Sequence, residues 1–200
     1  GSVKRQAQCL LVVSILIVGY LYGRSTNTLD TKGLIERLEE VMPERAQSLA
    51  YRFRNEIELS ERSREKPWFG WGGYRRGFIF DERVGRTDTV VAGTWIIRYN
   101  EAGLFGLIGY FAALLCPVIL VVRKYRKIPW EHDQRLLVGL AFIPLLYALE
   151  SLPNSVSITT PFLVAGACWR LTRTLSDSNY IQKEERRRRR NGSSKYPRLP

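Results

Sequence analysis

The chain has 200 residues, a net charge of +12 and 45% hydrophobic residues. This length suffices for one domain of ordinary size. The hydrophobic residues gather in blocks that approach bilayer length, and basic residues cluster beside them, which argues against a soluble nucleic-acid-binding protein. Three cysteines, Cys9, Cys116 and Cys168, lie inside these blocks at spacings that fit neither a metal site nor a disulfide framework, so we interpret them as packing residues.

Two apolar blocks predict single membrane helices. The first block, 9–23, follows Lys4 and Arg5, and we predict a membrane helix over 1–23. A signal peptide is the alternative, but no small-residue cleavage site clearly follows the block. The second block, 102–122, carries no charge and reaches the length of about 20 residues that one crossing requires.

Two shorter apolar blocks, 136–149 and 157–169, flank a Pro-Asn turn. We predict a membrane helical hairpin over 136–172, with a re-entrant pair as the alternative. The predicted fold class is therefore all-α, a polytopic membrane protein with about four membrane helices and a helical external loop. Because the chain begins Gly-Ser rather than Met, and an apolar block follows almost at once, we expect it to be a piece of a larger bundle.

Basic clusters predict the orientation, because Lys and Arg concentrate on the cytoplasmic side of membrane proteins. One cluster precedes the first block, a second lies at 123–127 and a third at 186–190. With four crossings all three fall on one side, which makes 123–135 a cytoplasmic loop. The tail 173–200 is predicted to be cytoplasmic and disordered, and able to bind anionic lipid headgroups. Residues 24–101 then form an external loop on a multi-pass protein of the plasma (inner) membrane.

Two amphipathic helices are predicted in this external loop. Residues 34–42 place apolar side chains on one stripe. Pro43 breaks that run and can occupy the first turn of a second helix, which ends before Lys66-Pro67. This second helix is expected either to be a solvated face with ion pairs or to lie along the membrane surface.

A stretch rich in glycine, aromatic residues and arginine follows at 66–76. Its glycines allow a close approach of the backbone, and its aromatic residues are typical of the lipid headgroup level. The aromatic residues in question are Trp68, Phe69, Trp71 and Tyr74. Arg75 and Arg76 come directly after them, and arginine binds phosphate through two parallel hydrogen bonds.

The order of these features resembles the O-antigen ligase and polymerase-like membrane proteins. Arg52 precedes a Pro-x-x-Gly-x-Gly element at 67–72, and a Glu-x-Gly-Leu-x-Gly element at 101–106 opens the next membrane helix. The resemblance covers roughly 44–122. It departs from the pattern at 92–93, where many ligases carry a His-Asn pair and this chain has Ala-Gly. The only histidine, His132, lies in the predicted cytoplasmic loop.

The resemblance implies an enzyme that transfers a glycan from undecaprenyl diphosphate to an acceptor hydroxyl, by ligation or by polymerisation. Fixed arginines would stabilise the charge of the leaving diphosphate without a metal. We expect Arg52 to be the first of these diphosphate-binding residues, followed by Arg75, Arg76 and Arg45. Glu101 is the candidate catalytic base, beside Arg98; a carboxylate placed for the helix dipole is its alternative interpretation.

The expected partners are the membrane, a lipid-linked glycan donor, a glycan or lipid acceptor, and the remainder of a larger membrane protein. We expect no cofactor, no metal and no nucleic acid. The alternative function is a non-catalytic membrane scaffold or assembly subunit of a polysaccharide synthesis or export system. A transporter or channel fragment is less favoured, because ion paths need charged groups inside the spans.

Overall fold

The computed structural model describes residues 2–26, 28–29, 33, 36, 40–73, 76–78, 80–81, 86–87, 93–155 and 157–190. The chain is all-α, as predicted, apart from one short antiparallel pairing of the two-residue strands β1 (Phe80–Asp81) and β2 (Arg86–Thr87). The α-helices are α1 (Val3–Ser25), α3 (Pro43–Arg64), α4 (Thr94–Lys124), α5 (Glu131–Glu150), α6 (Thr160–Leu175) and α7 (Ser178–Arg190), and the 3-10 helix η1 (Tyr125–Lys127) follows α4.

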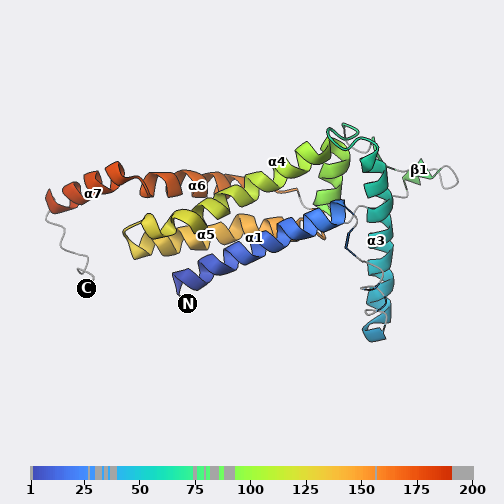
Figure 1. The fold of residues 1–200 in the computed structure, drawn as a ribbon, viewed down its shortest axis with the longest axis horizontal. Coiled ribbons are helices and arrows are strands. Elements are labelled where there is room, and N and C mark those ends of the chain that lie inside the picture. Colours follow the sequence, from blue (N-terminus) through green and yellow to red (C-terminus); the bar gives the residue numbers. More distant parts are fainter. Residues whose placement is uncertain are drawn as a thin grey trace.

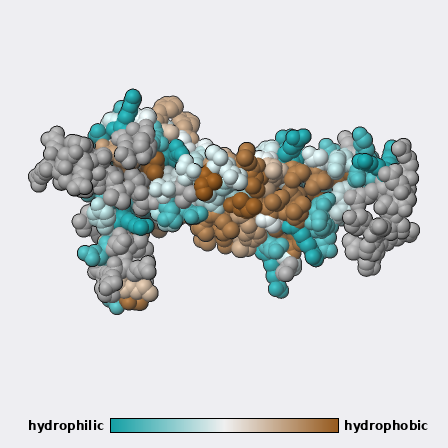
Figure 2. Space-filling view, turned by 180° about the vertical axis from the view of Figure 1, so that it is seen from behind, coloured by the Kyte–Doolittle hydropathy of each residue, from teal (hydrophilic) through white to brown (hydrophobic). Residues whose placement is uncertain are grey.

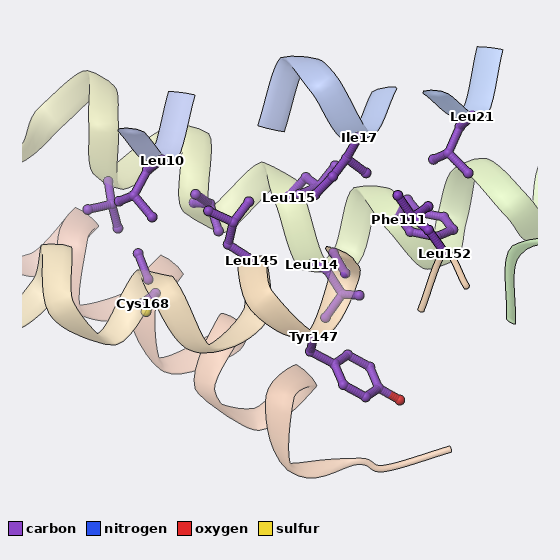
Figure 3. Packing of buried hydrophobic residues seen from close by; sticks show 14 of the residues in the cluster. Leu10, Ile17, Leu21, Phe111, Leu114, Leu115, Leu145, Tyr147, Leu152 and Cys168 are labelled. Atoms are coloured by element: carbon purple, nitrogen blue, oxygen red, sulfur yellow. The ribbon is translucent and has the colours of Figure 1, made fainter. Parts of the chain in front are cut away.

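Helices α1, α4, α5 and α6 form a bundle, and α3 lies crosswise at one end of it (Figure 1). Leucine, isoleucine and valine side chains from the bundle helices meet in one buried cluster, part of which is seen in Figure 3. Cys168 is buried in this cluster, whereas Cys9 and Cys116 are exposed. The packing interpretation therefore holds for Cys168 alone.

Two helical segments are long and apolar enough to cross a membrane, namely Val3–Ser25 and Thr94–Lys127. Many of their large apolar side chains are exposed, such as Leu16 and Ile108. Hydrophobic residues gather over the middle of the molecule and hydrophilic ones toward its ends (Figure 2). Exposed apolar surface of this extent marks a contact with lipid or with another protein.

The predicted hairpin forms, because α5 and α6 pack on each other and on α4. Neither α5 nor α6 is both long enough and apolar enough to count as a candidate membrane span, as α1 and α4 do. Charged residues stand near both ends of α5, and α6 has only 16 residues. Two candidate membrane spans are thus seen in the described part of the chain, fewer than the four predicted.

The two ends of the bundle differ in what they carry. The N-terminus, the connection between α4 and α5, and α7 lie at one end, while α3 and β1 lie at the other (Figure 1). The first of these ends holds the three basic clusters of the sequence. This shared end is the arrangement that four crossings of the chain would produce.

The basic tail differs from its prediction. Disorder was expected over 173–200, but α6 continues to Leu175 and 178–190 form the helix α7, while 191–200 lie outside the described residues. The reason is composition, because lysine, arginine, glutamate and glutamine are good helix formers, and Arg187 lies 4.0 Å from Glu184, one turn earlier. Between α1 and α4, the helix α3 forms where the second helix was predicted, with Pro43 in its first turn. Most of the first predicted helix, 34–42, lies outside the described residues.

Candidate functional site at the break of helix α4

Helix α4 is broken at Gly103. The backbone there has φ 65° and ψ −161°, a conformation that is essentially restricted to glycine. The break separates a short first part, 94–102, which lies beside α3, from a long second part, 104–124, which lies in the bundle (Figure 1). The membrane helix predicted over 102–122 is therefore this second part, and α4 begins eight residues earlier than expected.

The loop 66–73 is inserted into this break. In an unbroken helix Leu104 and Phe105 would donate their backbone N–H groups to the carbonyls four residues earlier, at Asn100 and Glu101. Instead, the Leu104 N–H donates to the Pro67 carbonyl at 2.7 Å and the Phe105 N–H donates to the Trp68 carbonyl at 3.3 Å. Both N–H groups therefore have an acceptor, and this acceptor belongs to the loop instead of the helix.

The two carbonyls that the break leaves free are bound by the same loop. The Trp71 N–H donates to the Asn100 carbonyl at 2.8 Å, and the Gly72 N–H donates to the Glu101 carbonyl at 2.9 Å. We call these four hydrogen bonds the backbone bracket. The two N–H groups and the two carbonyls at the break are therefore paired, which avoids the cost of leaving buried backbone groups without partners.

Glycine is required on both sides of the bracket because the two backbones touch. A Cβ atom at Gly70, where φ is 67°, would lie 2.5 Å from the Asn100 carbonyl oxygen. A Cβ atom at Gly103 would collide with the Trp68 carbonyl group. The two glycine elements that carried the family resemblance, at 67–72 and 101–106, are thus in direct contact.

Two charged side chains stand at the break. The Arg98 guanidinium lies 3.4 Å from the Glu101 carboxylate, whose side chain is 16% exposed. Arg98 also lies over the ring of Tyr110, at 5.4 Å from its centroid. The buried Arg98 Nε makes no hydrogen bond within the described part of the chain, while the Arg98 side chain as a whole is 39% exposed.

A buried ion pair joins α1 to α3 next to the break. Arg24 donates to the Glu56 carboxylate at 2.5 Å, and both side chains are only 4% exposed. The rings of Phe53 and Trp95 lie 4.9 and 5.8 Å from the Arg24 guanidinium. Burial raises the pKa of Glu56, while the charges of Arg24 and, more weakly, Arg52 oppose that rise.

The structure separates the residues that the sequence grouped. Glu101 lies at the break, and Arg76 is exposed just beyond the loop, with its backbone N–H on the Gly73 carbonyl. Arg52 is exposed on α3, one turn before Glu56. Arg45 lies in the first turn of α3, eighteen residues or about 27 Å along the helix from the end that contacts α4. Arg75 lies outside the described residues.

Asn100 is a residue of this site that the sequence interpretation missed. Its side chain is buried and donates to the Ser63 hydroxyl of α3 at 3.0 Å, while its carbonyl belongs to the bracket. A Cβ atom at Gly77 would collide with the Asn100 amide. Asn100 therefore contacts α3, the loop and the break together. The signal for it was an amide directly before the Glu-x-Gly element, at the start of an apolar block.

No protein-family model, curated protein or solved structure matches this chain. A function must therefore be argued from the geometry of the break and from the motifs that meet there.

Proposed function

We propose that this chain is part of a membrane glycosyltransferase related to the O-antigen ligases and polymerases. It moves a glycan from a polyprenyl diphosphate carrier to an acceptor hydroxyl on the external face of the plasma membrane. The observation that carries this proposal is the backbone bracket, because it joins the two glycine elements of the resemblance at the end of an apolar bundle. A broken helix of this kind, with charged residues beside it, is how membrane proteins build polar sites at the edge of the bilayer.

The proposed reaction divides the charged residues into two roles. The acceptor oxygen attacks the anomeric carbon of the sugar, the bond from that carbon to the diphosphate breaks, and Glu101 takes the proton of the acceptor hydroxyl. Arginines stabilise the charge that collects on the departing diphosphate. Arg98 is the best placed, because it pairs with Glu101 at the break and its side chain is 39% exposed. Arg52, Arg75 and Arg76 remain candidates, and Arg45 is the weakest because of its place on α3.

The proposal includes four membrane crossings, by α1, α4, α5 and α6. The length of α1 is about 34 Å and that of 104–124 about 31 Å, against about 30 Å for the hydrocarbon core of a bilayer. Helix α6 reaches only about 24 Å, so its end of the hairpin would lie within the headgroup region. The basic end of the bundle would face the cytoplasm, and the loop 24–101 with α3 would lie outside.

Glycan transfer by the full-length protein tests the proposal, in cells or in proteoliposomes with a lipid-linked donor. Replacing Glu101 with glutamine is expected to lower the transfer rate by about 10²-fold or more, the usual contribution of a general base. Arg98→Gln and Arg52→Ala are expected to lower it as well. Arg135→Ala is the matched control, because Arg135 pairs with Glu131 at the opposite end of the bundle. This variant should transfer glycan at the wild-type rate.

Membrane expression and helix content are compared for all four variants. If the Glu101, Arg98 and Arg52 variants transfer glycan as fast as the Arg135 control, the catalytic proposal fails. The non-catalytic scaffold or assembly subunit would then be the better interpretation of the external helices.

A further inference from the structure

Three aromatic side chains form an exposed patch beside the bracket. Trp68 and Phe69 come from the inserted loop, and Phe105 comes from the first turn of α4 after the break. Their exposed fractions are 60%, 76% and 60%. The rings of Phe69 and Phe105 stack with centroids 5.3 Å apart, and those of Trp68 and Phe105 are 6.0 Å apart. We call these three residues the aromatic patch.

The backbone holds the aromatic patch in place. The hydrogen bond from the Phe105 N–H to the Trp68 carbonyl joins the two halves of the patch, and Gly103 lies two residues before Phe105. The patch is therefore a fixed projection from the break, built before any partner binds. Exposing three large rings on a rigid backbone costs free energy in water, which points to contact with an apolar medium.

The patch lies between an apolar surface and a charged one. Ile108, one turn after Phe105 on the same side of α4, is 63% exposed and continues the apolar surface of the bundle. On the other side, the cations of Arg62 and Lys66 lie 4.0 and 4.2 Å from the ring centroid of Trp71. Tryptophan and cations at the end of an apolar surface are typical of the level where lipid headgroups meet acyl chains.

The structure separates aromatic residues that the sequence placed together. The Trp71 indole N–H donates to the Arg62 carbonyl at 3.0 Å, so its ring is held between α3 and the loop. Trp68 and Phe69 have their rings exposed instead. Tyr74 lies outside the described residues. Trp71 is thus a structural residue, and Trp68 and Phe69 are the ones free to enter lipid.

We propose that the aromatic patch is a bilayer anchor. Trp68 and Phe69 insert at the boundary between headgroups and acyl chains, with Lys66 near the lipid phosphates, and so fix the depth of the bracket in the membrane. Through the bracket, Arg98 and Glu101 are held at headgroup level. This inference rests on the membrane location in the proposed function, and it is independent of glycosyl transfer.

Depth-dependent fluorescence quenching tests the anchor. The full chain, which has five tryptophans, is reconstituted in phosphatidylcholine vesicles that carry bromine either close to the headgroup or deep in the acyl chains. Trp68→Phe is expected to lower the emission that shallow bromine quenches, because the substitution removes the inserted indole. Trp71→Phe is the matched control in the same loop, and it should change the shallow quenching less, because the Trp71 ring is held between α3 and the loop.

A second variant keeps the test decisive if Trp68→Phe folds poorly. Phe69→Trp adds an indole to the patch and should increase quenching by shallow bromine. Equal shallow quenching in wild type, Trp68→Phe and Phe69→Trp overturns the anchor. Quenching of Trp68 by aqueous iodide but not by brominated lipid also overturns it. The patch would then be a contact surface for a glycan or a protein. Repeating the measurement with Glu101→Gln separates the anchor from catalysis, because that variant should be inactive and still show the wild-type quenching.

Discussion

Replacing Gly103 with alanine would disrupt the backbone bracket, and its cost follows from the structure. Alanine at φ 65° and ψ −161° is strained by about 1–3 kcal/mol. The added Cβ also collides with the Trp68 carbonyl, so the loop must leave the break and lose the four hydrogen bonds, each worth about 0.5–1.5 kcal/mol. The strain and the four lost hydrogen bonds sum to about 3–9 kcal/mol while the break persists. A helix that straightens relieves the strain and restores the hydrogen bonds of Leu104 and Phe105 to Asn100 and Glu101, so the loss is then limited to the contacts of the loop.

Two measurements in detergent micelles or nanodiscs check this loss. Denaturant unfolding gives the change in the free energy of unfolding, and hydrogen exchange follows the Trp71 and Gly72 amides, which should exchange faster in the variant. Gly109→Ala is the control in the same helix, because nothing lies within 4 Å of an added Cβ there. The control is expected to change stability by about 1 kcal/mol or less, in the stabilising direction. Wild-type stability and slow Trp71 exchange in Gly103→Ala would refute the account of the bracket.

The buried pair of Arg24 and Glu56 gives two further predictions. Glu56→Leu should lower the free energy of unfolding by about 3–5 kcal/mol, because it leaves Arg24 buried without a counter-charge. The Arg24→Leu/Glu56→Leu double variant should lose less than the sum of the single variants. Unfolding of the wild type, both single variants and the double variant measures this coupling. Because burial raises the pKa of Glu56, the folded protein binds a proton that the unfolded chain has already lost, so the free energy of unfolding should fall as pH rises from about 4.5 through the raised pKa. Glu56→Gln should flatten this fall, and an unchanged pH profile would contradict the assignment.

Local patterns predicted the helices well. Pro43 and the apolar spacing after it predicted α3, and the uncharged block 102–122 predicted the second part of α4. These features depend on residues within a few turns of one another, so periodicity and propensity suffice to find them. The prediction of disorder in the tail was wrong for 178–190. The charge of this segment suggested disorder, while its helix-forming side chains produced α7.

The site was predictable only in part. The resemblance drew attention to the elements at 67–72 and 101–106, but their contact joins backbone groups 29 to 37 residues apart in sequence. The pairing of Arg24 with Glu56 and the bond from Asn100 to Ser63 are likewise set by tertiary packing. No local period contains such contacts, and a lone buried asparagine or arginine looks like any other polar residue at the start or end of an apolar block.

The bracket also has an evolutionary consequence. All four of its hydrogen bonds join main-chain groups, so substitutions at Trp68, Phe69 or Trp71 leave its donors and acceptors in place. A side chain cannot fit at Gly70 or Gly103, and Gly72, which donates one of the four bonds, has a φ of 66°, so the joint directly constrains these three glycines. The joint thus constrains glycines up to 33 positions apart in the sequence, while the side chains of the aromatic residues between them take no part in its hydrogen bonds.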